Sequence, residues 1–131
     1  MANVIYPLFK QHLMNGDIDL ITDAVRAVLI DIGTYTYDAA HDAYDDLTGV
    51  VGTESSALAG KTVVGAKFDS NDIVFSAVTG DTVEALVLFV DSGTPATDYL
   101  IAYLDTGTGL PVTPNGGDIN ITVNASGWFD L

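Results

Sequence analysis

The apolar positions of the chain change their period near residue 16 and so divide it into a short helical start and a long β region. In residues 6–14, four apolar residues recur at the spacing of one helix face: Leu8, Phe9, Leu13 and Met14. Pro7 suits the first helical turn, and Gly16 suits a helix end. We predict one short helix here, which needs packing against the rest of the chain to be stable.

After residue 16, short apolar or alternating runs are separated by clusters of Gly, Asp, Asn and Pro. Such punctuation at intervals of roughly 8–12 residues is typical of an all-β protein. The predicted strands are residues 24–32, 49–58, 61–68, 73–78, 83–90, 99–104, 118–124 and 128–129. Residues 35–37 either extend an edge strand or lie in a loop, and residues 39–47 are expected to form one or two helical turns.

About eight short strands and one helix predict an antiparallel β-sandwich or jelly-roll-like fold. A parallel sheet is disfavoured because no helices separate the strands to make crossovers. A chain of 131 residues has the size of one domain and can bury a core. We therefore expect a single domain over residues 1–131, in which residues 1–16 form an N-terminal arm and the short helix.

The charge and the cysteine content narrow the range of partners and sites that the chain can have. Eighteen acidic residues face four basic ones, for a net charge of −14, and there is no cysteine. Nucleic-acid binding requires a basic surface, so we expect no nucleic-acid partner, and anionic membranes are disfavoured for the same reason. Disulfides and thiolate metal sites are excluded. No apolar stretch approaches the ~20 residues of a membrane helix, so we also expect no membrane insertion.

The frame Asp-x-Gly-Thr occurs three times, each time after an apolar run, at residues 31–34, 91–94 and 105–108. It resembles the catalytic signature of aspartic proteases, in which two carboxylates share one proton. Asp91 or Asp105 would then be the catalytic residue. Two frames lie only 14 residues apart, however, and the flap and the helix that such proteases carry downstream are not indicated.

The alternative interpretation of the frame is structural. Asp accepts hydrogen bonds from a turn backbone, Gly supplies a positive φ and Thr resumes the strand. The two histidines, His12 and His41, accompany no nucleophile elbow, phosphate loop or metal-binding motif. We therefore prefer turns to a protease dyad, name no catalytic residues and predict that the chain is not an enzyme.

One turn carries the best candidates for a metal ligand. Asp69, Asn71 and Asp72 cluster between two predicted strands, and oxygen-rich loops suit calcium. The chain lacks the twelve-residue calcium-loop pattern, so an Asp-rich turn is the preferred interpretation and no cofactor is expected. A calcium-stabilised carbohydrate-binding module remains an alternative, and its aromatic platform would need Trp128, the only tryptophan.

Several segments that are mostly turns follow one another over nearly the whole chain: residues 6–9 (YPLF), 17–20 (DIDL), 28–31 (VLID), 60–63 (GKTV), 68–73 (FDSNDI), 78–81 (VTGD) and 107–117 (GTGLPVTPNGG). In this order they resemble a group of small structural proteins of tailed-bacteriophage virions. The resemblance implies a virion protein, specifically a capsid decoration or cement protein that binds the outside of the shell and stabilises it. A tail, baseplate or fibre component is the alternative.

This resemblance also implies partners and a location. We expect the protein in the virion, bound to the major capsid protein or another virion protein, as a homo-oligomer, either a trimer or a dimer. Tyrosine is favoured at interfaces, which makes the tyrosines of the Ala- and Asp-rich loop candidate contacts: Tyr35, Tyr37 and Tyr44. The N-terminal residues could add a strand to a partner's sheet: Ala2, Asn3, Val4 and Ile5.

Overall fold

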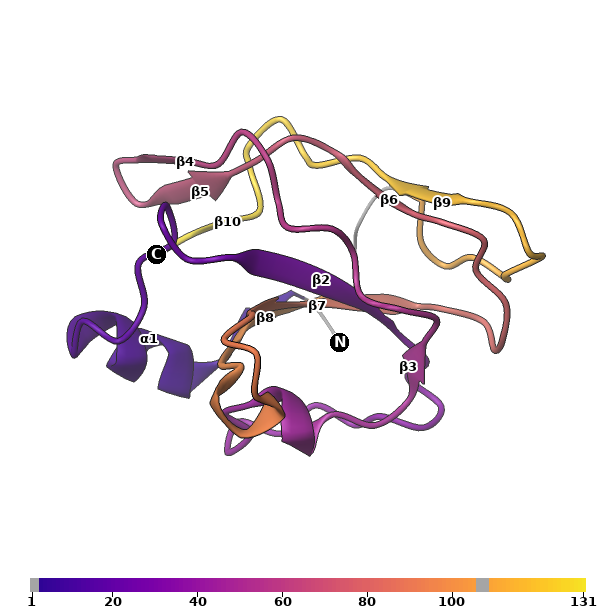
Figure 1. Cartoon of the computed structure of the whole chain (residues 1–131), viewed down its shortest axis with the longest axis horizontal. Helices are drawn as coiled ribbons and strands as arrows, with labels where there is room; N and C mark the ends of the chain where they lie inside the picture. Colours follow the sequence, from indigo (N-terminus) through magenta and orange to yellow (C-terminus); the bar gives the residue numbers. More distant parts are fainter. Residues whose placement is uncertain (1–2, 106–108) are drawn as a thin grey trace.

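A five-stranded antiparallel sheet in the order β1-β8-β7-β2-β3 forms the middle layer of the molecule (Figure 1). Its strands are β1 (Val4–Ile5), β2 (Val25–Ile30), β3 (Val50–Val51), β7 (Ala85–Val90) and β8 (Leu100–Leu104). The computed structural model describes residues 3–105 and 109–131. β2 and β7 pair along their full length, from Val25 opposite Val90 to Ile30 opposite Ala85, and this ladder is the centre of the fold.

Two smaller antiparallel sheets form a second layer above the first in Figure 1. One has the order β10-β5-β4, and the other pairs β6 with β9. Their bounds are β4 (Thr62–Val64), β5 (Lys67–Asp69), β6 (Ile73–Phe75), β9 (Ile119–Ile121) and β10 (Phe129–Asp130). All strand pairs of the three sheets are antiparallel, so the predicted all-β, sandwich-like fold with one short helix is confirmed.

Loops and helices cover the other face of the middle sheet. α1 (Pro7–Met14) lies at one end, and the loop of residues 31–49 lies below the sheet with its 3-10 turn η1 (Tyr44–Asp46), beside η2 (Pro95–Thr97) (Figure 1). Because other segments of the chain cover both faces of this sheet, every residue of β7 and β8 is buried. This explains why both strands are continuous apolar runs instead of alternating ones.

The structure corrects several predicted elements. Residues 61–68 are not one strand, because β4 and β5 form a hairpin joined by Gly65 and Ala66. Gly65 has a φ of 62°, as the first residue of a type II′ hairpin turn requires. By contrast, the helical turn expected in residues 39–47 is present as a single 3-10 turn, and residues 35–37 lie in a loop, one of their two expected alternatives. Met14, expected on the packed face of the helix, is 82% exposed.

The buried apolar residues form one cluster that spans the three sheets and α1. Residues 49–58 join it mostly without strand geometry, because only Val50–Val51 is a strand. Beyond β3 the chain still follows β2: the Ser55 amide donates to the Ala27 carbonyl at 2.8 Å, and Leu58 does the same to Val25 at 2.8 Å. The segment therefore covers the edge of β2 that a longer strand would otherwise pair with.

Candidate functional site

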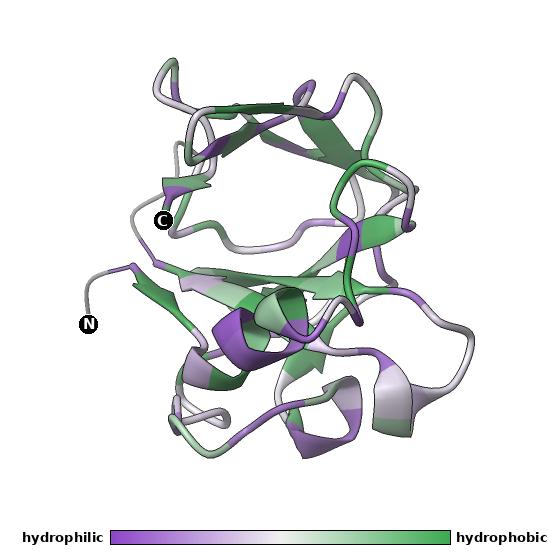
Figure 2. Cartoon of the chain, turned by 90° about the vertical axis from the view of Figure 1, so that its left-hand side faces the viewer, coloured by the Kyte–Doolittle hydropathy of each residue, from purple (hydrophilic) through white to green (hydrophobic). Residues whose placement is uncertain are grey.

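An apolar groove lies at the end of the molecule where α1, the β4–β5 hairpin and the C-terminal strand meet (left in Figure 1; Figure 2 views this end). Its volume is about 590 Å³, within the range of ligand and peptide sites. The lining is mainly apolar and comes from three segments: Leu13, Gly16, Ile18, Asp19, Leu20, Ile21, Val63, Gly65, Ala66, Phe68, Phe129 and Leu131.

Aromatic rings form the floor that holds this groove in shape. Phe68 is 1% exposed and packs against Phe129 with ring centroids 5.5 Å apart. Phe129 in turn meets the buried Phe9 of α1 edge-on at 5.9 Å. The hairpin, the C-terminal strand and the helix are thereby tied together, and the groove has a rigid base built from residues distant in sequence.

Large apolar side chains that face solvent are concentrated at this end. Seven of them are exposed within the described residues, and five belong to segments that border the groove: Met14 (82%), Ile21 (48%), Val63 (47%), Val64 (70%) and Leu131 (49%). Isolated exposed apolar residues are normal, but a group of them beside a groove marks a contact surface. We call the groove and these five residues the apolar end.

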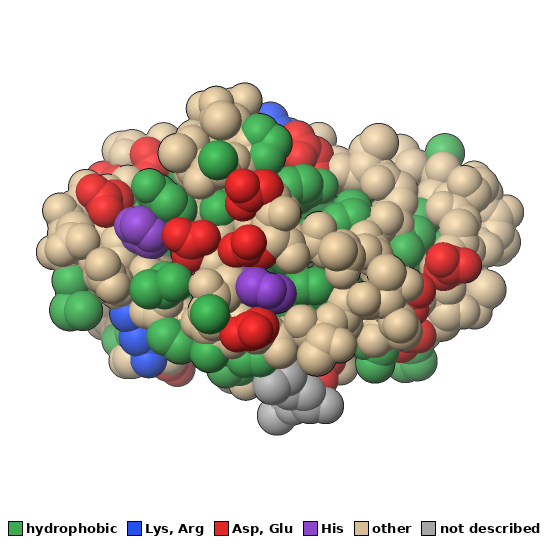
Figure 3. All heavy atoms as spheres, turned by 90° about the horizontal axis from the view of Figure 1, so that it is seen from below, with side chains coloured by type: hydrophobic (Ala, Val, Ile, Leu, Met, Phe, Trp, Pro, Cys, Tyr) green, Lys and Arg blue, Asp and Glu red, His purple; other side chains and the backbone are tan. Residues whose placement is uncertain are grey.

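The apolar end also differs from the rest of the molecule in charge. Residues 7–21, 60–69 and 128–131 carry three lysines and four aspartates, a net side-chain charge of −1, which leaves −13 of the total −14 to all other residues. Figure 3 shows one strongly acidic region, the loop face, where Asp and Glu side chains gather around both histidines. An acidic partner, including a second copy, meets less repulsion at the apolar end than at the loop face.

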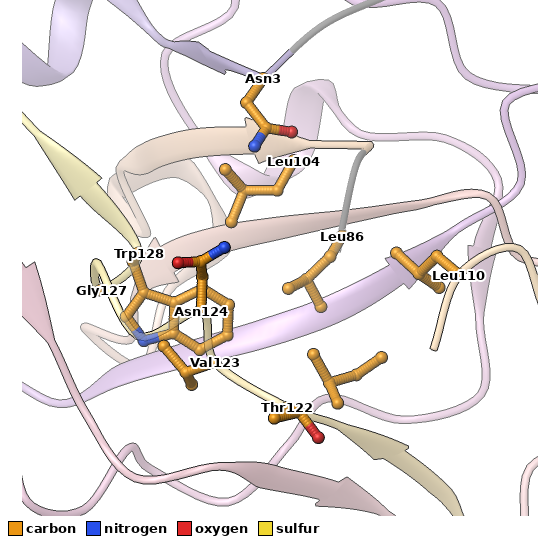
Figure 4. A pocket seen from close by; sticks show the side chains of 10 residues that line it. Asn3, Leu86, Leu104, Leu110, Thr122, Val123, Asn124, Gly127 and Trp128 are labelled. Atoms are coloured by element: carbon orange, nitrogen blue, oxygen red, sulfur yellow. The ribbon is translucent and has the colours of Figure 1, made fainter. Parts of the chain in front are cut away.

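A second cavity lies between the layers, near Trp128 (Figure 4). It measures only about 80 Å³, room for a few water molecules and too little for a sugar ring. Trp128 is half-buried, and its Nε1 donates to Ser70 Oγ at 2.8 Å. The ring is thus part of the packing between layers and does not form the open platform that a carbohydrate-binding module would use.

The Asp-x-Gly-Thr frames at residues 31–34 and 91–94 are turns. Asp31 Oδ1 accepts from the Gly33 amide at 2.9 Å, and Asp91 Oδ1 accepts from the Gly93 amide at 3.0 Å. Gly93 has the expected positive φ of 90°; Gly33 does not, so the expectation is wrong there. The third frame, residues 105–108, lies largely outside the described residues.

The same geometry bears on the protease interpretation. Asp31 follows β2 and Asp91 follows β7, and the two strands are antiparallel. Their carboxylates therefore lie at opposite ends of a six-residue ladder, roughly 20 Å apart by the rise of a strand. Asp91 is moreover engaged by Arg26, whose Nε lies 2.7 Å from Asp91 Oδ2. These two aspartates of one chain do not form a dyad.

The three candidate calcium ligands contact separate parts of the backbone. Asp69 Oδ1 accepts from the Ser70 amide at 2.8 Å, and Asp72 Oδ1 accepts from the Val123 amide at 2.8 Å. The amide of Asn71 packs against Gly60, where an added Cβ would meet Asn71 Oδ1 at 2.6 Å. Within residues 3–105 and 109–131, no group of three or more His, Cys, Asp or Glu side chains is placed to hold a metal ion.

The expectation that Tyr35 is exposed is wrong. Tyr35 is 2% exposed, and its hydroxyl lies 2.8 Å from the Tyr6 hydroxyl and 2.8 Å from His41 Nδ1. Burial raises the pKa of both tyrosines, and the hydrogen bond with Tyr35 raises that of Tyr6 further. Tyr37 and Tyr44 are half-buried and pack on the core, so their role as contacts stays a prediction.

The N-terminal residues predicted to form a docking arm belong to the molecule's own sheet. Val4 pairs with Tyr103 and Ile5 with Ala102 of the same chain, so β1 completes the molecule's own sheet. Asn3 Oδ1 accepts from the Asp105 amide at 2.8 Å, which fixes the start of this strand. Ala2 lies outside the described residues. β1 is therefore not a free arm, but it lies at the edge of its sheet, and its role as a partner contact stays a prediction.

Sequence reasoning missed the residues of the apolar end, because it placed Val63 and Val64 inside one long strand. The signal that could have found them is Gly65, which interrupts the apolar run where the hairpin turns.

None of the helices in the described part of the chain is long and apolar enough to cross a membrane. No protein-family model matches the chain, and no curated protein is detectably similar to it in sequence.

Proposed function

We propose that this chain is a structural protein of a tailed-bacteriophage virion that decorates the outside of the capsid and acts by protein–protein contact. The observation that carries the contact role is the apolar end, where five exposed apolar side chains belong to the segments that border a groove, in a region of near-neutral charge. The turn segments that resemble virion proteins supply the phage assignment. The partner on the particle would be the major capsid protein or another virion protein.

The physical properties of the chain suit this role. A cement protein must stay soluble until it meets the shell, and a net charge of −14 opposes non-specific aggregation. It must also bind through surface complementarity without a cofactor, which an apolar groove with a rigid aromatic floor provides. The fully covered central strands leave a small, rigid scaffold on which that surface is held.

Quantitative mass spectrometry of purified virions tests the proposal. A decoration protein should be present in hundreds of copies per particle, comparable to the major capsid protein. A few to tens of copies would move the protein to the tail, baseplate or fibre. Its absence from purified particles would overturn the virion role altogether, and a particle reconstruction would show which surface of the shell carries it.

A further inference from the structure

The outer edge of β4 is open. In the sheet order β10-β5-β4, β4 pairs with β5 on one side, and within the described residues no strand pairs with it on the other. Thr62, Val63 and Val64 are all exposed, and this stretch has no charge, proline or bulge of the kind that protects natural sheet edges. The neighbouring Lys61 is turned away, because its Nζ donates to the Asp23 carbonyl.

The backbone of Val63 faces this open edge. In a two-residue hairpin the residues that flank the turn, here Val64 and Lys67, form the hydrogen-bonded pair. The next pair, Val63 and Phe68, is then not hydrogen-bonded. The Phe68 carbonyl instead accepts from the Trp128 amide at 2.8 Å, on the side of β10. The amide and carbonyl of Val63 therefore point outward, where a further strand can bind them.

We propose that two copies of this chain pair through β4, antiparallel and related by a two-fold axis at Val63. The pair forms one six-stranded sheet in the order β10-β5-β4-β4-β5-β10. Each Val63 exchanges its outward amide and carbonyl bonds with the Val63 of the second copy. Because Val63 also lines the groove, its side chain and that of its mate meet where the two grooves adjoin, and both lose their exposure to water.

A second copy suits this edge because the edge is complementary to itself. Around a two-fold axis at Val63, Thr62 lies opposite Val64, and Lys61 lies opposite Gly65. No like charges face each other, and Thr and Val are favourable cross-strand partners. The charge distribution favours this end over the acidic loop face, since the apolar end carries −1 of the total −14. Two copies approaching by the loop face meet stronger repulsion.

Cysteine cross-linking tests the register directly, because the chain has no cysteine of its own. In Val63→Cys the two introduced residues are a hydrogen-bonded antiparallel pair, with Cα atoms about 5.5 Å apart, within reach of a disulfide. Val74→Cys is the matched control: it is 50% exposed against 47% for Val63 and lies on a strand of another sheet. Under mild oxidation we expect a covalent dimer from Val63→Cys only. Equal cross-linking of both variants, or none from Val63→Cys, would overturn the pairing.

Sedimentation equilibrium of the purified chain provides the second test. Val63→Lys places two like charges across the axis and should raise the dimer dissociation constant by about tenfold or more, whereas Val74→Lys, with the same change in net charge, should not. Added NaCl should tighten the wild-type dimer, because it screens the repulsion between two acidic copies. A wild-type chain that stays monomeric at about 100 μM, or a dimer indifferent to Val63→Lys, contradicts the proposal. Circular dichroism checks that both variants are folded.

This inference rests on the proposed function only in taking the apolar end as a contact surface, and the two fail separately. Both tests use the purified chain without particles. A β4-paired dimer that is absent from virions would overturn the virion role and keep the pairing. Abundant copies on particles, with no cross-link at Val63, would do the reverse.

Discussion

The central strands and the β4–β5 hairpin are both rich in apolar residues, yet the molecule treats them in opposite ways. Every residue of β8 is at most 4% exposed, because the small sheets cover one face and loops the other. In β4, Val63 and Val64 are 47% and 70% exposed, with a strand partner on one side only. Within the described chain, the apolar side chains of the central strands are buried in the core, whereas two of those in the hairpin face solvent.

The difference shows where stability and where binding reside. Removing a side chain from the centre leaves a cavity, while removing one from the hairpin leaves the folded monomer almost unchanged. Changes at the hairpin should instead alter what the chain contacts. Four substitutions, taken in order of decreasing predicted effect, test this separation.

The largest effect is expected for Leu88→Ala in β7. Leu88 is completely buried between the layers, so its truncation should lower the free energy of unfolding by about 3 kcal/mol through lost burial and the cavity left behind. Urea denaturation followed by circular dichroism measures the change. A loss below about 1 kcal/mol would mean that the centre is loosely packed, and the contrast with the hairpin would disappear.

Arg26→Ala tests the single charged side chain of β2. Arg26 bonds Asp91 through Nε at 2.7 Å and the Ser55 carbonyl through a terminal nitrogen at 2.9 Å. Losing these charge-assisted bonds in a half-buried setting should cost about 2 kcal/mol. Lys10→Ala, which removes the same charge from an exposed position on α1, is the control and should change little in the same urea titrations. Equal losses in both variants would show that net charge, and not the Arg26 contacts, sets the effect.

Tyr6→Phe should cost about 1 kcal/mol near neutral pH, because it removes one buried hydrogen bond to Tyr35. It should also change the pH dependence. The folded pKa of Tyr6 is raised above the ordinary 10.0, so the folded state holds this proton more tightly than the unfolded state does. Stability is complete below pH 10 and falls as the pH rises above it.

The measurement is the urea midpoint between pH 8 and about pH 11.5. The wild-type midpoint should fall above pH 10, and the fall should be shallower in Tyr6→Phe. Part of it should remain, because burial also raises the pKa of Tyr35 and Tyr103. An equal fall in both proteins would remove Tyr6 as its source.

The smallest effect is expected for Val64→Thr, an exchange of nearly equal shape at the most exposed hairpin valine. The free energy of unfolding of the monomer should stay within about 0.5 kcal/mol of the wild type. The same exchange at the fully buried Val87 of β7 places a hydroxyl in the core and should cost about 1–3 kcal/mol. Thermal melts of the two variants at low protein concentration make the comparison, and similar losses would contradict it.

Much of the fold could be predicted from local pattern. The helix at Pro7–Met14 has its proline start and its glycine end where expected, and β7 and β8 lie inside the two most apolar predicted runs. The hairpin was missed because residues 61–68 look like one apolar strand until Gly65 is recognised as a turn. The candidate site was missed with it, since its lining comes from three segments far apart in sequence.

Tyr35 and the N-terminal residues also show that contacts between distant segments cannot be predicted from local sequence. Both were expected to contact a partner because of their residue type and position, and both make contacts within the chain. Tyr35 is hydrogen-bonded to Tyr6 and His41, and Val4 pairs with Tyr103. Residue type indicates that a side chain suits an interface. It does not indicate whether the chain's own fold has already occupied it.

The antiparallel β class, the single short helix and the turn role of the frames at Asp31 and Asp91 follow from local sequence, because strand period and turn chemistry act over a few neighbouring residues. Which apolar residues are covered becomes clear only from the folded molecule. The fold buries both faces of β7 and β8 and leaves the edge of β4 open beside a groove. Coverage depends on contacts between segments tens of residues apart, and a local pattern does not carry that information.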